Sequence, residues 1–171
     1  MLNDIGQFTN PAEVMEVRIL IEPRIANLAA MYATLADIDH MKRCLEKLEY
    51  AVAYKGNGKD GVIYDRWDGT LHRAIAESTG NTLLLILFDS LNSVRSHYMW
   101  GRLQTAAMTN TRWQLYCRQH RRVVEAIALR DAILAERSMH EHLEAVRNNL
   151  LEVKFLTNDG NHRAPMPLIS T

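Results

Sequence analysis

The chain has 171 residues, of which 47% are apolar and 23% are charged, and its formal net charge is zero. This balance suits one ordinary globular domain and excludes the basic footprint of a nucleic-acid-binding domain. No apolar run approaches the about 20 residues of a membrane span, and the N-terminus lacks the order of a signal peptide. Cys44 and Cys117 form no metal or disulfide pattern, so we expect a cytoplasmic protein without membrane contact.

The spacing of apolar residues is helical from the first predicted element onward. A first helix is predicted over 11–32, opened by an Asn-Pro pair. Thr34 and Asp37 resemble a capping box, which predicts a second helix that runs to about Tyr54. The glycine-rich stretch 56–61 then predicts a loop.

The third predicted helix starts at Tyr64 and ends near Gly80, a residue suited to a C-terminal cap. Asn81 can cap the helix that follows. Three more helices are predicted from caps and periodicity, over about 81–103, 110–130 and 131–156. The fold class is therefore all-α, an antiparallel bundle of six or seven helices. We expect three parts, namely a linker remnant (1–10), the helical domain (11–156) and a flexible tail (157–171).

Two short motifs resemble known sites but lack their context. The stretch GNGKDG at 56–61 matches a dinucleotide-binding pattern letter for letter, yet it joins two predicted helices instead of a strand and a helix. The stretch HEHLE at 140–144 begins like a zinc-protease helix, yet Glu144 stands where the second histidine ligand belongs. Both are interpreted as ordinary sequence, a loop and a helix face.

One set of ionisable residues stands on the apolar faces of three predicted helices. Asp68 and His72 are four residues apart on one helix, and His120 and His142 lie within the apolar stripes of two others. A divalent ion would remove the cost of burying such a carboxylate, because it binds deprotonated and convergent groups. A lone histidine on an apolar face is more often a hydrogen-bonded core residue. From spacing alone, a metal site and a polar core both remain open.

Three segments resemble a known family in order and spacing. EVRILIEPRIANLAA (16–30) is similar to its opening helix, DGTLHRAIAESTGN (68–81) to its D-x-x-F-H signature, and QHRRVVEAIALRDAILAERSMHEHL (119–143) to its closing histidine segment. The family is the FCD domain, the effector-binding domain of FadR-type GntR transcription regulators. Leu71 and Val123 depart from the usual phenylalanine and isoleucine, and both changes keep an apolar side chain.

The resemblance implies a sensor that binds metal and is not an enzyme. The family's ligands, one aspartate and three histidines, fall on Asp68, His72, His120 and His142, while His140 should point away. One divalent transition metal per chain is expected, with zinc first and nickel, iron or manganese as alternatives. In the family this metal lies in a cavity inside the bundle and holds, or helps to hold, a small organic acid, so the resemblance implies a central metal or ligand cavity here.

The predicted effector is therefore a small carboxylate whose far end is held by a cation or an amide. Arg18 is the first choice, on the apolar stripe of the opening helix, and Arg95, Asn149 and Asn81 follow. Two of these have simpler explanations. Arg18 can form a buried salt bridge with Glu22, four residues on, and Asn81 can cap a helix.

Partners follow from the same resemblance. A homodimer is expected, and DNA would be bound only through a winged helix-turn-helix domain that this chain lacks. The chain is then either a piece of a regulator or a protein that has lost its DNA-binding half, and we favour the piece. Two other functions stay open at this point. One is a small helical metalloenzyme, a metal-activated hydrolase, and the other is a dimerisation module without a ligand.

Overall fold

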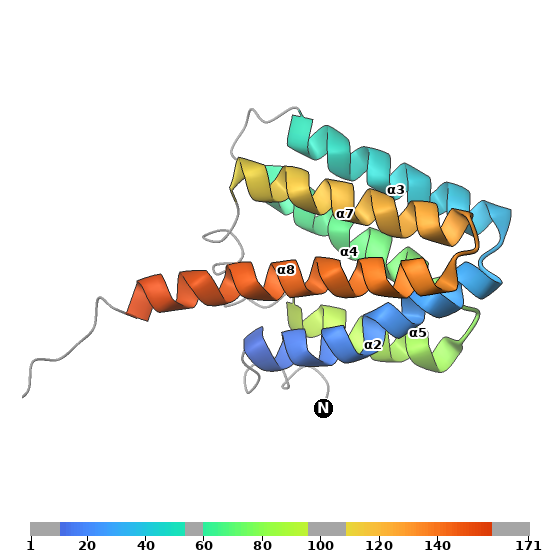
Figure 1. Ribbon diagram of the computed structural model, residues 1–171, viewed down its shortest axis with the longest axis horizontal. Coiled ribbons are helices and arrows are strands. Elements are labelled where there is room, and N and C mark those ends of the chain that lie inside the picture. The colour runs from blue at the N-terminus through green and yellow to red at the C-terminus, as the bar shows by residue number, and fades with distance from the viewer. Residues whose placement is uncertain (1–10, 54–59, 96–108, 159–171) are drawn as a thin grey trace, which may run out of the picture.

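The computed structural model describes residues 11–53, 60–95 and 109–158, which form six helices and no strand (Figure 1). The helices are α2 (Pro11–Tyr32), α3 (Leu35–Ala53), α4 (Asp60–Glu77), α5 (Thr82–Arg95), α7 (Asn110–Ala128) and α8 (Ala132–Asn158). The prediction of an all-α bundle is confirmed. None of these helices combines the length and the apolar character that a membrane span requires.

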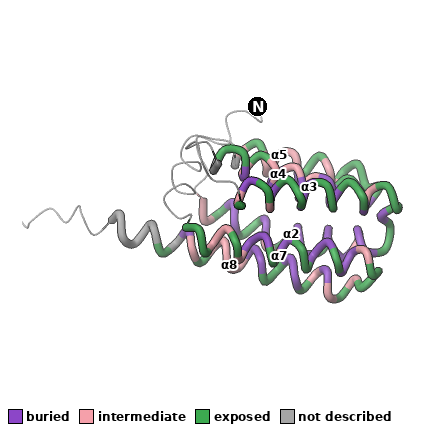
Figure 2. Tube along the Cα trace, turned by 90° about the horizontal axis from the view of Figure 1, so that it is seen from above, coloured by how far each residue is buried: buried purple, intermediate pink, exposed green. Residues whose placement is uncertain are grey.

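The helices pack in two layers of three (Figure 2). One layer contains α3, α4 and α5, and the other contains α2, α7 and α8, with α8 lying between α2 and α7 (Figure 1). Buried positions of both layers face the space between them, where aliphatic, aromatic and sulfur-containing side chains form one core. The helix pairs with the most extensive contacts across this space are α3 with α7 and α2 with α4 and α5.

The helix ends follow the predicted cap residues. The backbone N–H of Thr34 donates to Oδ2 of Asp37 at 2.8 Å and that of Asp37 donates to Oγ1 of Thr34 at 3.2 Å, which completes the capping box. Gly80 ends the α4 segment with a φ of 67°, a left-handed conformation that glycine adopts without strain. Asn81 caps α5, and Thr109 caps α7.

Several predicted boundaries shift or lie beyond the described residues. Helix α4 begins at Asp60, four residues before the predicted start, and α8 continues to Asn158, two residues past its predicted end. The linker remnant 1–10, most of the loop 56–61, the predicted helix end near Leu103 and the tail from residue 159 lie outside the described residues. The central cavity stays a prediction.

Candidate metal centre

Four ionisable side chains from three helices meet in the core. Asp68 and His72 come from α4, His120 from α7 and His142 from α8, and each exposes 6% or less of its surface. One ligand atom of each lies within 4.8 Å of those of the other three. Because α4 carries its two residues four apart, one helical face presents both of them to the neighbouring helices. The structure therefore brings together all four predicted metal residues.

The distances within this group match those expected around one ion. Nε2 of His120 lies 3.2 Å from Oδ1 of Asp68 and 3.1 Å from Nε2 of His72. Oδ1 of Asp68 and Nε2 of His72 are 3.9 Å apart. Two ligand atoms that each bind one ion at about 2.1 Å lie roughly 3 to 4 Å from each other. The four donors, one carboxylate and three imidazoles, thus fit a divalent transition metal in type and in spacing.

Neighbouring acceptors orient two of the three imidazoles. Nδ1 of His72 lies 2.5 Å from Oε2 of Glu22, and Nδ1 of His142 lies 3.2 Å from Oε1 of Gln119. Both oxygens are acceptors, so both Nδ1 atoms carry the proton and donate. The Nε2 atoms are then left with lone pairs, which is the tautomer that a metal ligand needs.

Charge and burial act in opposite directions on these groups. Burial raises the pKa of Glu22, but the nearby Arg18 and His72 outweigh it and hold that pKa at about 2. Burial lowers the pKa of His120 below its ordinary value, against the influence of Asp68. Burial and the other two histidines lower the pKa of His142 much further. Burial therefore favours the neutral form of His120 and His142, which is the form that metal binding requires.

The side chain of Arg18 is buried on α2 and forms the salt bridge that the sequence offered as its alternative role. Its Nε donates to Oε1 of Glu22 at 2.6 Å, and Nη2 lies 3.5 Å from Oε2. Among the described residues, the hydrogen-bond partner of Nη1 is the weak acceptor Sδ of Met15, at 3.9 Å. Arg18 is thus linked to the metal group through Glu22 and His72, and its Nη1 retains N–H groups that can donate to a ligand.

The other predicted effector residues lie in different surroundings. Asn149 is half-buried on α8, and its Nδ2 donates to the hydroxyl of Tyr116 at 2.6 Å. Asn81 is exposed, and its Oδ1 accepts from the backbone N–H groups of residues 83 and 84. Arg95 is the last residue of α5, and its side chain is not among those described. His140 is exposed on α8, as expected of a residue outside the group.

Sequence reasoning missed three residues around the group. Glu22, expected only as a salt-bridge partner of Arg18, also orients His72, and no role was predicted for Gln119. Tyr64 was read only as the start of a helix, yet it is 2% exposed and stacks on Trp113 with ring centroids 6.0 Å apart. Its position four residues before Asp68 was the available signal, because that spacing places both residues on one face.

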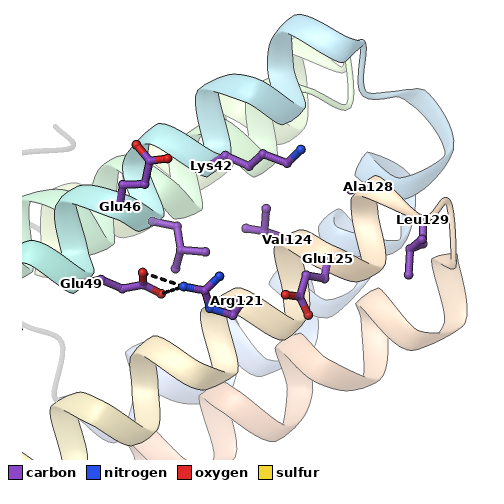
Figure 3. A pocket seen from close by; sticks show the side chains of 9 residues that line it. Lys42, Glu46, Glu49, Arg121, Val124, Glu125, Ala128 and Leu129 are labelled. Atoms are coloured by element: carbon purple, nitrogen blue, oxygen red, sulfur yellow. Dashed lines mark hydrogen bonds and ion pairs between the residues drawn. The ribbon is translucent and has the colours of Figure 1, made fainter.

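A groove on the outer surface lies apart from the metal group. It has a volume of about 450 Å³ between α3 and α7, and the exposed ion pair of Arg121 and Glu49 spans it (Figure 3). None of the four metal residues lines it. Arg121 and Arg122 both face solvent and pair with glutamates, Glu49 and Glu141, so this part of α7 is a solvated helix face.

Comparisons with known proteins place this arrangement among transcription regulators. A family model described as the FCD domain matches residues 13–145. The Uxu operon transcriptional regulator of Escherichia coli (strain K12) is 33% identical over 153 residues, which cover 88% of this chain and 56% of that protein. The Glc operon transcriptional activator of the same organism is 27% identical over 160 residues, covering 91% and 61%. The chain therefore spans little more than half the length of these relatives.

Two solved structures share the fold. Streptococcus agalactiae GntR superposes with a TM-score of 0.63 at 24% identity, covering 80% of this chain and 57% of that one. E. coli McbR/YncC superposes with a TM-score of 0.66 at 19% identity, covering 87% and 65%. At these identities the likeness supports the helical architecture alone.

Proposed function

The chain belongs to the FCD domain family, the effector-binding domains of GntR-type transcription regulators, and we propose that it senses a small carboxylate with the help of a bound metal ion. Members of this family are regulators and not enzymes, so the alternative of a metal-activated hydrolase falls away.

The observation that carries the proposal is the convergence of Asp68, His72, His120 and His142. Each is buried, and a carboxylate in an apolar core is costly unless a cation balances it. The Nδ1 contacts of His72 and His142 turn their Nε2 lone pairs inward, which suits an ion and not a network of donors. When bound, the ion would supply a Lewis-acidic position for an anionic ligand.

A carboxylate effector fits this centre for two reasons. A carboxylate binds a divalent ion through one or two oxygens, and four protein ligands leave positions open on a six-coordinate ion. Arg18 lies beside the group with donor capacity on Nη1, and Asn149 lies on the same face of α8 as His142, one heptad later. Binding would shift the helices that contribute ligands, and a longer regulator would read that shift through its DNA-binding part.

Metal analysis of the purified domain tests the proposal directly. We expect about one equivalent of transition metal per chain by mass spectrometry, removable by a chelator and restored by zinc, nickel or manganese. The double variant His120→Ala, His142→Ala should lose this metal and unfold at a lower temperature. His140→Ala is the matched control, because His140 is exposed and outside the group, and it should retain the metal. Full metal content in the double variant would refute the site.

Carboxylate binding is then measured by calorimetry on metal-loaded and metal-free protein. The proposal requires that at least one small carboxylate binds the loaded form and binds the metal-free form much more weakly. Equal affinity of a carboxylate for both forms would show that its binding does not depend on the metal.

We further propose that the chain pairs as a homodimer, the commonest assembly of soluble oligomers. One apolar row is exposed on α5, where Leu83, Ile86 and Leu87 expose 65%, 55% and 43% of their surfaces. Further along, the hydroxyls of Ser90 and Ser93 donate to carbonyls of their own helix. A second copy of α5 can therefore cover this face without stranding those hydroxyls.

A further inference from the structure

We propose that the hydroxyl of Tyr64 is a specificity-determining contact for the effector, which is a carboxylate with a single negative charge and a neutral hydroxyl or carbonyl oxygen that Tyr64 binds. The inference rests on the proposed metal-assisted sensing. It adds a residue that the motif comparison did not select, and it narrows the class of acid.

The position of Tyr64 places it on the helix face that carries Asp68 and His72. It stands one helical turn before Asp68 on α4, so the two share a face. Its ring stacks against Trp113 of α7, seven residues before His120 on that helix. Burial first, and then the negative charge of Asp68, raise the pKa of Tyr64 well above its ordinary value, so the phenol stays protonated and can donate.

The hydroxyl of Tyr64 is buried without a hydrogen-bonding partner in the part of the chain that the structure describes. Such groups are rare in folded proteins, because the lost hydration is not replaced. The neighbouring tyrosine on α7 differs in this respect, since the hydroxyl of Tyr116 accepts a hydrogen bond from Asn149 at 2.6 Å. Because this phenol also stands on the face of α4 that carries Asp68, a molecule bound at the metal centre can supply the missing oxygen.

The buried charges define the class of that molecule. Histidines that bind a metal do so in the neutral form. Among the described residues, the buried side chains with a formal charge are then Arg18, Glu22 and Asp68. Together they sum to minus one, so a divalent ion brings the centre to plus one. One carboxylate makes the centre neutral, whereas a dicarboxylate would leave an excess negative charge in the core. The second polar group of the ligand should therefore be neutral, as a phenol partner also requires.

Matched acids test the inference by calorimetry on metal-loaded protein. The probes are lactate, propionate and malonate with three carbons, and gluconate, hexanoate and adipate with six. In at least one set the hydroxy acid should bind the wild type more tightly than the unsubstituted acid and the diacid. Tyr64→Phe should weaken binding of that hydroxy acid about tenfold and leave the unsubstituted acid unchanged.

Ser138→Ala is the matched control. Ser138 also has a buried hydroxyl with no partner among the described residues, four residues before His142 on α8. Because α8 runs antiparallel to α7, as the pairs Tyr116–Asn149 and Arg122–Glu141 show, Ser138 lies on the opposite side of the metal group from Tyr64. This variant should bind every probe as the wild type does.

The stability of the ligand-free protein supplies a second readout. Tyr64→Phe removes a hydroxyl that makes no described bond, so the melting temperature without ligand should not fall, while the rise on adding the hydroxy acid should shrink. Equal affinity of wild type and Tyr64→Phe for the best hydroxy acid would overturn the inference, as would tighter binding of the diacids. Failure of every acid to bind metal-loaded wild type would instead refute the proposed carboxylate sensing, and with it this inference.

Discussion

The carboxylate of Glu22 on α2 lies 2.5 Å from Nδ1 of His72 on α4, although 50 residues separate the two in the sequence. This contact fixes the ring of His72 and directs its Nε2 toward Asp68 and His120. Arg18 donates to the other carboxylate oxygen of Glu22, so a series of side-chain contacts runs from α2 to the candidate metal centre. The centre thus depends on a helix that supplies none of its four ligands.

Replacing Glu22 tests that dependence. Glu22→Gln should lower metal affinity about 10- to 100-fold, because residues that orient a metal-bound histidine typically contribute that much. Affinity is measured by competition with a chelator of known strength. Glu141→Gln is the control, since Glu141 also pairs with an arginine but is exposed, and it should leave the affinity unchanged. An unaltered affinity in Glu22→Gln would show that the ring is oriented without this contact.

Arg18→Lys separates structural from effector-binding roles of Arg18. Lysine preserves the positive charge near Glu22 but has no planar fork, so it cannot hold Glu22 and a ligand together. We expect retained metal and about tenfold weaker binding of the best carboxylate by calorimetry. Arg24→Lys, on the same helix but exposed, should behave as the wild type. If Arg18→Lys binds that carboxylate equally well, Arg18 serves the salt bridge alone.

Asn81→Ala should destabilise the domain by about 1 kcal/mol, because Oδ1 of Asn81 accepts from two backbone N–H groups at the start of α5. Urea unfolding measures the loss. Asn81→Ser retains a capping oxygen and should recover most of it. Neither variant should change carboxylate affinity, and a selective loss of affinity in both would restore Asn81 as an effector contact.

Light scattering tests the dimer and its surface. The wild type should have the mass of two chains, and Ile86→Glu should shift it toward one, because a charge in the middle of an apolar interface is left desolvated. Ile133→Glu is the matched control, since Ile133 exposes 80% of its surface on α8. A monomeric wild type at high concentration would refute the pairing. A dimeric Ile86→Glu would show that the dimer interface does not involve this face of α5.

Both cysteines should resist thiol reagents in the folded protein. Burial first, with a contribution from Glu49, raises the pKa of Cys117 to about 12, and burial raises the pKa of Cys44 from its ordinary value of 9.0. At pH 8 we expect no labelling without denaturant and two labelled thiols with it. Above about pH 9 the thiols of the unfolded chain ionise first, so stability should fall as pH rises. Rapid labelling of native protein at pH 8 would contradict the burial.

The sequence by itself determined the local structure and the identity of the candidate ligands. Periodicity and cap residues such as Thr34 and Asp37 are local signals, because they depend on backbone groups three or four residues away. The same holds for Asp68 and His72, whose spacing on one helix places them on one face. His120 and His142 were found on apolar stripes and matched to the family's closing segment.

Only the tertiary structure decided how these faces meet. The pairing of Glu22 with His72 and the isolation of the Tyr64 hydroxyl depend on α2, α4 and α7 being packed side by side, which no local pattern encodes. Arg18 shows the limit most clearly. Its spacing to Glu22 allowed a salt bridge. The structure adds that Glu22 also binds His72 and that, among the described residues, Nη1 of Arg18 is bonded to the sulfur of Met15. A side chain's free hydrogen-bonding capacity is set by every helix around it, and so it appears only in the assembled core.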